Sequence, residues 1–148
     1  MTQEDKELIL KDLCARLPYG VKATTTSNGW RDVYIVSGCN DNRIYLNCPV
    51  YDEGDDEWLI ESVKLYLRPM SSMTEEEVTE LAYKVFQQPD IDIVRRWVFE
   101  NKLYPSIDGN PVMVIDWLNS HHFDYRGLIP KGLALEALEG MYNHVYKQ

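Results

Sequence analysis

The stretch Tyr66-Leu-Arg-Pro-Met-Ser-Ser-Met-Thr-Glu-Glu-Glu77 separates two halves of the sequence that have different hydrophobic patterns. Before it, apolar residues alternate as they do in strands, and after it they recur at the spacing of helices. Pro69 lacks a backbone donor and so discourages a strand from continuing. Thr74 and Glu77 have the spacing of a capping box, and the glutamates before Glu77 favour a helix N-terminus. The stretch therefore predicts the end of a sheet and the start of a helix.

The first half predicts one helix followed by a four-stranded antiparallel meander. Thr2 can cap the helix, and apolar residues then recur at helical spacing: Leu8, Ile9, Leu13, Cys14 and Leu17. Strands are expected at about 21–26, 30–37, 43–47 and 58–67, with a hairpin turn at Asn28-Gly29 and an acidic loop at 49–57. Along the second strand, Ile35 is expected on the face opposite to Tyr34 and Val36, and apolar residues on both faces predict that the strand is partly covered on each.

The second half predicts three or four helices. Helical spacing relates Val78, Leu81, Ala82, Val85 and Phe86, and Asp90 can cap a further helix. A loop is expected at 103–109. Asn110 and Pro111 mark the start of the next helix. The pattern of residues 133–146 allows a last helix, but Gly132 and Gly140 oppose it, so that segment stays open. The fold class is therefore α+β, with the helices packed on the sheet. The 148 residues form a single domain, in which 1–69 is helix plus sheet and 70–148 is mainly helical.

Composition limits the classes of function. The formal net charge of -9 disfavours nucleic acid as a direct ligand, because grip on phosphates needs basic surface. An acidic surface is also compatible with an alternative function, namely an inhibitor that mimics nucleic acid and so blocks a nucleic-acid enzyme. No apolar run reaches the roughly 20 residues of a membrane span, and the acidic N-terminus does not resemble a signal peptide. We expect a soluble cytoplasmic protein without membrane partners.

The three cysteines are Cys14, Cys39 and Cys48. Their odd number and the absence of a CxxC pair are typical of reduced thiols in the cytoplasm. Cys14 belongs to the apolar stripe of the first helix and is expected to pack in the core. The spacing of Cys39 and Cys48 matches no zinc knuckle.

Polar side chains gather in Asp116-Trp-Leu-Asn-Ser-His-His-Phe-Asp-Tyr-Arg126. His121, His122 and Asp124 have side chains that can ligate a metal, and Asp116 lies a turn and a half upstream. Adjacent histidines of a helix point about 100° apart, so they rarely bind one ion together. The other interpretation is that these residues end a helix, where donors suit the last carbonyl groups.

Enzymatic function has little support in the sequence. No serine lies in a Gly-x-Ser-x-Gly context, and neither a P-loop nor a dinucleotide fingerprint is present. Ser120 and His121 are neighbours, but adjacent side chains of a helix do not face each other. No cofactor is expected, and the protein is more simply read as a non-enzyme.

Three segments carry a resemblance to a known family. They are Leu13-Cys-Ala-Arg-Leu-Pro-Tyr-Gly-Val21, the stretch from Tyr66 to Glu77, and Asp116-Trp-Leu-Asn-Ser-His-His-Phe-Asp-Tyr-Arg-Gly-Leu-Ile129. The sequence resembles a family of short proteins from Gram-negative gut anaerobes that are phage- or mobile-element-related and have no assigned activity. The resemblance implies a cytoplasmic location and a small accessory role. It assigns no catalytic residue.

The leading functional hypothesis is a non-enzymatic protein-binding or accessory protein of a phage or mobile element. Its partner would be another protein or a second copy of the chain, and His121, Asp124, Tyr125 and Arg126 would be the contacting residues. An exposed apolar and aromatic patch there would support this hypothesis. The alternatives are a metal-dependent hydrolase that uses His121, His122, Asp124 and Asp116, and the acidic inhibitor described above.

Overall fold

The computed structural model describes the chain except for residues 27–28, 30–31, 48–54, 101–110 and 143–148. It confirms the α+β class, with an N-terminal helix, a sheet and further helices. The chain divides into two compact units. Unit 1 consists of residues 1–67 and 126–148, and unit 2 consists of residues 68–125. The C-terminal segment thus belongs with the sheet rather than with the helical half.

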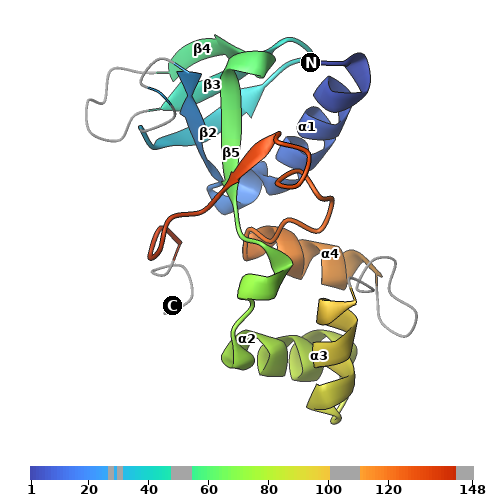
Figure 1. The fold of residues 1–148 in the computed structure, drawn as a ribbon. Helices are drawn as coiled ribbons and strands as arrows, with labels where there is room; N and C mark the ends of the chain where they lie inside the picture. Colours follow the sequence, from blue (N-terminus) through green and yellow to red (C-terminus); the bar gives the residue numbers. More distant parts are fainter. Residues whose placement is uncertain (27–28, 30–31, 48–54, 101–110, 143–148) are drawn as a thin grey trace. The chain divides into compact units, whose positions relative to one another are not determined.

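Unit 1 is a mixed sheet of six strands with one long helix (Figure 1). Its elements are α1 (Gln3–Arg16), η1 (Leu17–Tyr19), β1 (Lys22–Thr25), β2 (Tyr34–Cys39), β3 (Arg43–Asn47), β4 (Asp55–Leu59), η3 (Ile60–Ser62), β5 (Val63–Leu67) and β6 (Ala134–Glu136). The order of strands is β4-β3-β2-β1-β5-β6, and all neighbours are antiparallel except β5 and β6. The four-stranded meander predicted from the sequence is therefore extended by two strands.

The fourth strand expected at 58–67 is in fact two strands. A 3-10 turn at Ile60–Ser62 separates β4, which pairs with β3, from β5, which pairs with β1. Because β2 lies between β1 and β3, one continuous strand could not have reached both partners. The turn also buries Ile60, of which only 1% is exposed.

The last helix that the pattern allowed at 133–146 is not formed in its described part. Residues 134–136 form β6, which pairs in parallel with β5 through Leu65–Ala134, Tyr66–Leu135 and Leu67–Glu136. Gly132 and Gly140 both have positive φ, at 74° and 80°, and such backbone conformations do not continue a helix. Pairing with β5 gives this segment its backbone hydrogen bonds instead.

The helix α1 begins as predicted but turns a different face to the core. Thr2 caps it, and a capping box with Asp5 is complete. Its buried residues are Ile9, Asp12, Leu13 and Arg16, whereas Cys14 is exposed. The prediction that Cys14 packs in the core is therefore wrong. The buried face of the helix includes Asp12 and Arg16 in place of Cys14. These two charged side chains can be buried because they form an ion pair with each other.

In the part of unit 2 that the structure describes, the short 3-10 turn η4 (Met70–Ser72) is followed by four helical elements. They are α2 (Glu75–Glu80), the π-helix η5 (Leu81–Phe86), α3 (Ile91–Phe99) and α4 (Pro111–Ser120). The capping box is confirmed, because Thr74 Oγ1 accepts from Glu77 N at 3.2 Å and Glu77 Oε1 accepts from Thr74 N at 3.0 Å. Asp90 caps α3, and Pro111 is the first residue of α4, both as predicted.

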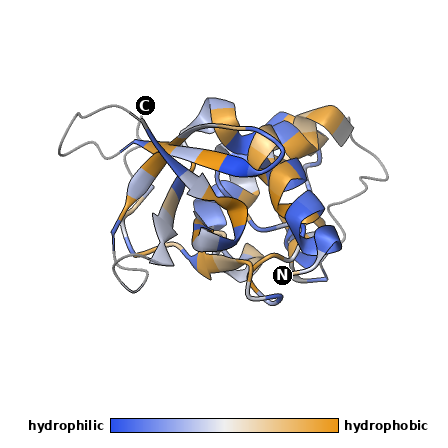
Figure 2. Cartoon of the chain, turned by 90° about the horizontal axis from the view of Figure 1, so that it is seen from above, coloured by the Kyte–Doolittle hydropathy of each residue, from blue (hydrophilic) through white to orange (hydrophobic). Residues whose placement is uncertain are grey.

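Each unit has its own apolar core. That of unit 1 joins α1 to one face of the sheet and includes Leu13, Ile44, Leu46 and Leu65. That of unit 2 joins its helices and includes Leu81, Val94, Leu118 and Phe123. Apolar residues accordingly occur both along the strands and on the helices (Figure 2).

Several expectations concern residues outside the described part of the chain. These are the hairpin turn at Asn28, the start of the second strand at Trp30, most of the acidic loop at 49–57, Cys48, the loop at 103–109, the cap at Asn110 and the end of the last helix after Tyr142.

Candidate functional site

Arg68 links the two most distinctive segments of the sequence within unit 2. Its backbone N–H donates to the His122 carbonyl oxygen at 2.8 Å, and its own carbonyl accepts from Asp124 N at 2.8 Å. These bonds make a parallel bridge between Arg68 and Phe123. Its guanidinium forms two hydrogen bonds with the Glu77 carboxylate, at 2.6 and 2.7 Å. One residue therefore holds the start of α2 to the segment that follows α4.

The Glu77 carboxylate is charged although it is largely buried. Burial on its own would raise the pKa of Glu77. The hydrogen bonds from Arg68 and from the Thr74 backbone N–H outweigh that effect, so the pKa lies below its usual value. A carboxylate with this many donors is fixed in position and is not poised to exchange a proton near neutral pH.

Four side chains stack beside this ion pair. The guanidinium carbon of Arg68 lies 4.2 Å from the centre of the Phe123 ring. The Phe123 and Trp117 rings are stacked at 5.9 Å, and the Trp117 and His121 rings at 4.0 Å. This is an attractive cation–π and aromatic series, and its members connect Arg68, which precedes η4, to α4 and to the segment after α4. The stack accounts for the burial of Phe123 and Trp117.

In space, His121 lies between Glu80 and Ser120, which is the order of acid, base and hydroxyl in the active site of a serine hydrolase. Glu80 Oε1 lies 3.9 Å from His121 Nε2, and Ser120 Oγ lies 3.0 Å from His121 Nδ1. The expectation that Ser120 and His121 do not face each other is therefore wrong, because His121 lies in the turn after α4.

The geometry of this trio nevertheless belongs to a helix end. His121 Nδ1 lies 2.9 Å from the Trp117 carbonyl oxygen, and Ser120 Oγ donates to the same oxygen at 2.8 Å. A carbonyl only accepts, so Nδ1 carries the proton there and cannot take one from Ser120. The arrangement satisfies a carbonyl group in the last turn of α4, as the helix-end interpretation predicts, and does not activate a nucleophile.

The other residues that the sequence singled out are mostly buried. His122 is 0% exposed and adopts φ 64°, and Asp124 and Tyr125 are each 7% exposed. Tyr125 donates from its hydroxyl to Asn119 Oδ1 at 2.9 Å. The side chains of His121 and Arg126 retain 12% and 20% exposure. These residues fix the chain path after α4 and offer little surface to a partner.

The four candidate metal ligands are not gathered at one point. Asp116 is exposed on α4, whereas His122 and Asp124 are buried. Among the residues that the structure describes, no three His, Cys, Asp or Glu side chains form a group that could hold a metal ion. Arg126, the last of the residues singled out from the sequence, belongs to unit 1 and forms an ion pair there with Asp12, its Nε 3.4 Å from Asp12 Oδ1.

An exposed surface that the sequence did not single out lies on unit 1. We call it the outer sheet face and define it by Ile35 on β2, Arg43 and Tyr45 on β3, and Glu57 and Leu59 on β4. Cross-strand pairs Tyr45–Glu57 and Arg43–Leu59 place these side chains together, opposite to the buried Ile44 and Leu46. The alternation predicted for the second strand is confirmed, but its apolar residues also predicted cover on both faces, and Ile35 is 37% exposed whereas Val36 is only 3%.

The outer sheet face combines apolar and ionic groups. Leu59 is 44% exposed, and Arg43 pairs with Glu57 at 3.2 Å. The Tyr45 ring lies over Gly38, since a Cβ added to this glycine would be 3.7 Å from Tyr45 Cδ2. The Tyr45 hydroxyl accepts a hydrogen bond from Asn40 Nδ2 at 2.9 Å. The aromatic ring is therefore held in place by the neighbouring strand and turn.

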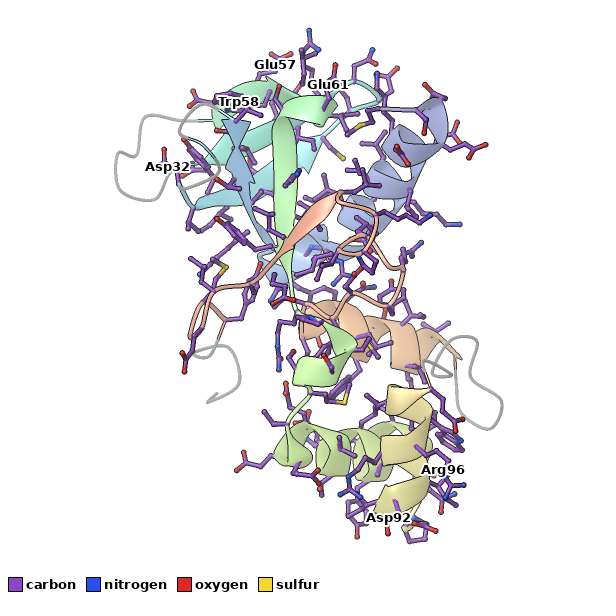
Figure 3. The ribbon with its side chains drawn as sticks, in the orientation of Figure 1. Asp32, Glu57, Trp58, Glu61, Asp92 and Arg96 are labelled. Carbon is purple, nitrogen blue, oxygen red and sulfur yellow. The ribbon has the colours of Figure 1, made fainter. Side chains whose placement is uncertain are left out.

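Acidic side chains also occur beside these strands. Figure 3 shows Glu57 and Glu61 near β4 and η3, and Asp32 shortly before β2. Glu61 pairs with Lys6 of α1, and Asp32 accepts from the Tyr34 hydroxyl, so only Glu57 of these three belongs to the outer sheet face. Asp56 and Glu57 are successive residues of β4, so their side chains point to opposite faces and do not form a row. On the face itself Arg43 offsets Glu57, whereas the chain as a whole is acidic, with 24 acidic and 15 basic residues.

No family model matches the chain, and neither the curated proteins nor the solved structures contain a significant match. None of the helices that the structure describes has both the length and the apolar character needed to cross a membrane. The function is therefore proposed from the residues of this chain.

Proposed function

We propose that the chain is a non-enzymatic protein-binding protein, and that the outer sheet face is its binding surface. One observation carries this proposal: the exposed side chains of Ile35 and Leu59 flank Tyr45 on three adjacent strands. A single exposed aliphatic side chain is ordinary, but apolar and aromatic groups on one sheet face are suited to a protein partner. Tyr45 adds a rigid aromatic surface with a polar end.

The partner that this surface fits is a protein with a basic rim around an apolar centre. The 24 acidic residues of the chain outnumber its 15 basic residues, and like charges across an interface cost free energy. The net charge of -9 therefore opposes a second copy of this chain as the occupant. It opposes nucleic acid for the same reason.

An accessory role in a phage or mobile element, and a cytoplasmic location, are part of this proposal. Both rest on the three segments that resemble such a family, since no geometric feature bears on them. The hydrolase alternative draws no support from the geometry, because its four residues do not converge. The inhibitor alternative draws none from β4, whose successive carboxylates alternate between faces.

The test compares capture of partners by wild type and by two matched double variants. Ile35→Thr/Leu59→Thr removes the apolar groups of the outer sheet face but keeps residues that favour strands. Val112→Thr/Met113→Thr is the control, because these α4 side chains are also exposed, at 66% and 46%. Each variant is immobilised and exposed to lysate of the source organism, and bound proteins are identified by mass spectrometry.

The expected result is a basic protein that wild type and the control retain and that the face variant loses. Its capture should weaken as salt concentration rises, because charge contributes to the contact. The proposal would be rejected if the same proteins bound all three chains equally, or if only the control lost them. Circular dichroism of each variant shows that the fold is retained in either case.

A further inference from the structure

Two cysteines that are distant in sequence meet on unit 1. Cys14 lies in the last turns of α1 and Cys39 ends β2, and their sulfur atoms are 3.6 Å apart. Both are free thiols. An S–S bond is about 2.05 Å long, so the sulfur atoms need to approach by roughly 1.5 Å to form one. Rotation about the side-chain bonds can supply a movement of this size.

A β-bulge accounts for the direction of Cys39. The register of β2 against β3 shifts between Val36 and Gly38, so that Val36 pairs with Leu46 but Cys39 pairs with Ile44. Leu46 and Ile44 both face the core beneath α1. Strict alternation from Val36 would have turned Cys39 to the opposite face. The extra residue Ser37 therefore directs the Cys39 thiol toward α1.

The two thiols differ in their surroundings. Cys14 is exposed, whereas Cys39 is partly covered and packs against the core of unit 1. Burial, followed by the hydrogen bond with Cys14, raises the pKa of Cys39 to about 11. Cys39 is therefore a thiol at neutral pH, and Cys14 is the sulfur that a reagent in solution meets first.

We propose that Cys14 and Cys39 form a redox modification site, which hydroperoxides oxidise to an intramolecular disulfide. Exposed Cys14 is the sulfur that attacks, and Cys39, held by the bulge, is the sulfur that resolves. The product links the outer side of α1 to the end of β2. This proposal is independent of the protein-binding function, because Cys39 faces away from the outer sheet face.

The reaction balances with hydrogen peroxide as the oxidant. The Cys14 thiolate attacks one peroxide oxygen, the O–O bond breaks, and hydroxide leaves to take up the proton that Cys14 lost. Cys39 sulfur then attacks the sulfur of Cys14 sulfenic acid, the S–O bond breaks, and water leaves with the Cys39 proton. Two thiols and one peroxide thus give one disulfide and two waters.

The experiment treats the folded, reduced full-length chain with hydrogen peroxide and follows its mass. Wild type is compared with Cys14→Ser, Cys39→Ser and Cys48→Ser. Trypsin separates all three cysteines, because they fall in residues 12–16, 32–43 and 44–64. Linked peptides therefore identify which thiols have paired.

Wild type and Cys48→Ser should lose about 2 Da and yield the peptides 12–16 and 32–43 joined by a bond that reductant cleaves. Cys39→Ser should gain about 16 Da at Cys14, trapped by dimedone as sulfenic acid, because no resolving thiol remains. Cys14→Ser should stay unmodified at the same peroxide dose. The oxidised wild type should also melt at a higher temperature than the reduced chain.

Three results would overturn the proposal. The first is a native chain that acquires no intramolecular disulfide. The second is a disulfide that includes the peptide 44–64 in wild type. The third is a Cys14→Ser variant that peroxide modifies as fast as wild type. The urea-unfolded chain is the control for geometry, and it should give mixed pairings in place of the single Cys14–Cys39 product.

Discussion

The Arg68 guanidinium and the Glu77 carboxylate form a two-pronged ion pair whose side chains are only 14% and 9% exposed. The two residues lie nine positions apart, on either side of the turn that leads from β5 into α2. Arg68 also pairs through its backbone with the segment after α4. Loss of either charge would leave the other buried without its partner.

We expect Arg68→Ala to destabilise unit 2 strongly, by about 3–5 kcal/mol, because it leaves the Glu77 carboxylate buried and uncompensated. Urea unfolding followed by intrinsic tryptophan fluorescence, to which Trp97 and Trp117 of unit 2 contribute, measures this change. Arg95→Ala is the matched control, since Arg95 pairs with Glu75 and Asp92 at the surface. It should change stability little. Equal effects of the two substitutions would contradict the structural role of Arg68.

The same ion pair predicts a pH dependence. The pKa of Glu77 is lowered in the folded chain, so its contribution to stability is fully present above the unfolded pKa of about 4.3. That contribution is lost as pH falls through the folded pKa. The difference in free energy of unfolding between wild type and Glu77→Gln should therefore shrink below about pH 4. Urea titrations between neutral pH and pH 3 test this, and a difference that grew on acidification would reverse the assigned sign.

Asp12 and Arg16 form a second buried pair, at 2.8 and 3.0 Å, with both side chains 0% exposed. Asp12→Ala should cost about 3–5 kcal/mol, because the Arg16 guanidinium stays in the core of unit 1 without this carboxylate. Thermal unfolding followed by circular dichroism measures the loss. Glu7→Ala on the exposed face of the same helix should leave the melting temperature almost unchanged.

Tyr142 bridges two strands through its hydroxyl. It accepts from Lys22 N at 2.9 Å and donates to the Tyr66 carbonyl at 2.8 Å, and the side chain is 3% exposed. Tyr142→Phe removes both bonds without changing the packing volume much, so we expect a loss of about 1–3 kcal/mol. Hydrogen exchange at the Lys22 amide should accelerate. The control Tyr83→Phe, at a tyrosine that is 56% exposed, should change neither the free energy of unfolding nor the exchange rate of the Lys22 amide.

Elements whose signals are local could be predicted from the sequence. The caps Thr2, Thr74 and Asp90 and the first-turn Pro111 act within a few residues, so their helices were correctly placed. The strand Arg43–Asn47 was also correct, because its alternation is complete within five residues. The identity of β6 was not predictable in this way, since its hydrogen bonds go to β5, about 70 residues earlier.

The candidate sites depended on contacts that no local pattern contains. The sequence predicts that His121, Asp124 and Tyr125 contact a partner, because they are polar residues in a segment rich in aromatic residues. Their segment is held by Arg68, which bonds to the His121 carbonyl through its side chain, 53 positions away, and to His122 and Asp124 through its backbone. The meeting of Cys14 and Cys39 depends on a one-residue bulge, which reverses the face expected from alternation. Ile35 was placed on the correct face because no bulge precedes it within β2.

The bridge between Arg68 and Phe123 has a consequence for how the chain assembles. Unit 2 is an insertion between β5 and β6, and its first residue, Arg68, is hydrogen-bonded to His122 and Asp124 near its end. Once these helices have folded, the two ends of the insertion are already close together. Pairing of β6 with β5 then no longer costs the entropy of closing a long flexible loop. Completion of the sheet is thus conditional on the inserted helices. A nascent chain would add the sixth strand only after the whole insertion has left the ribosome.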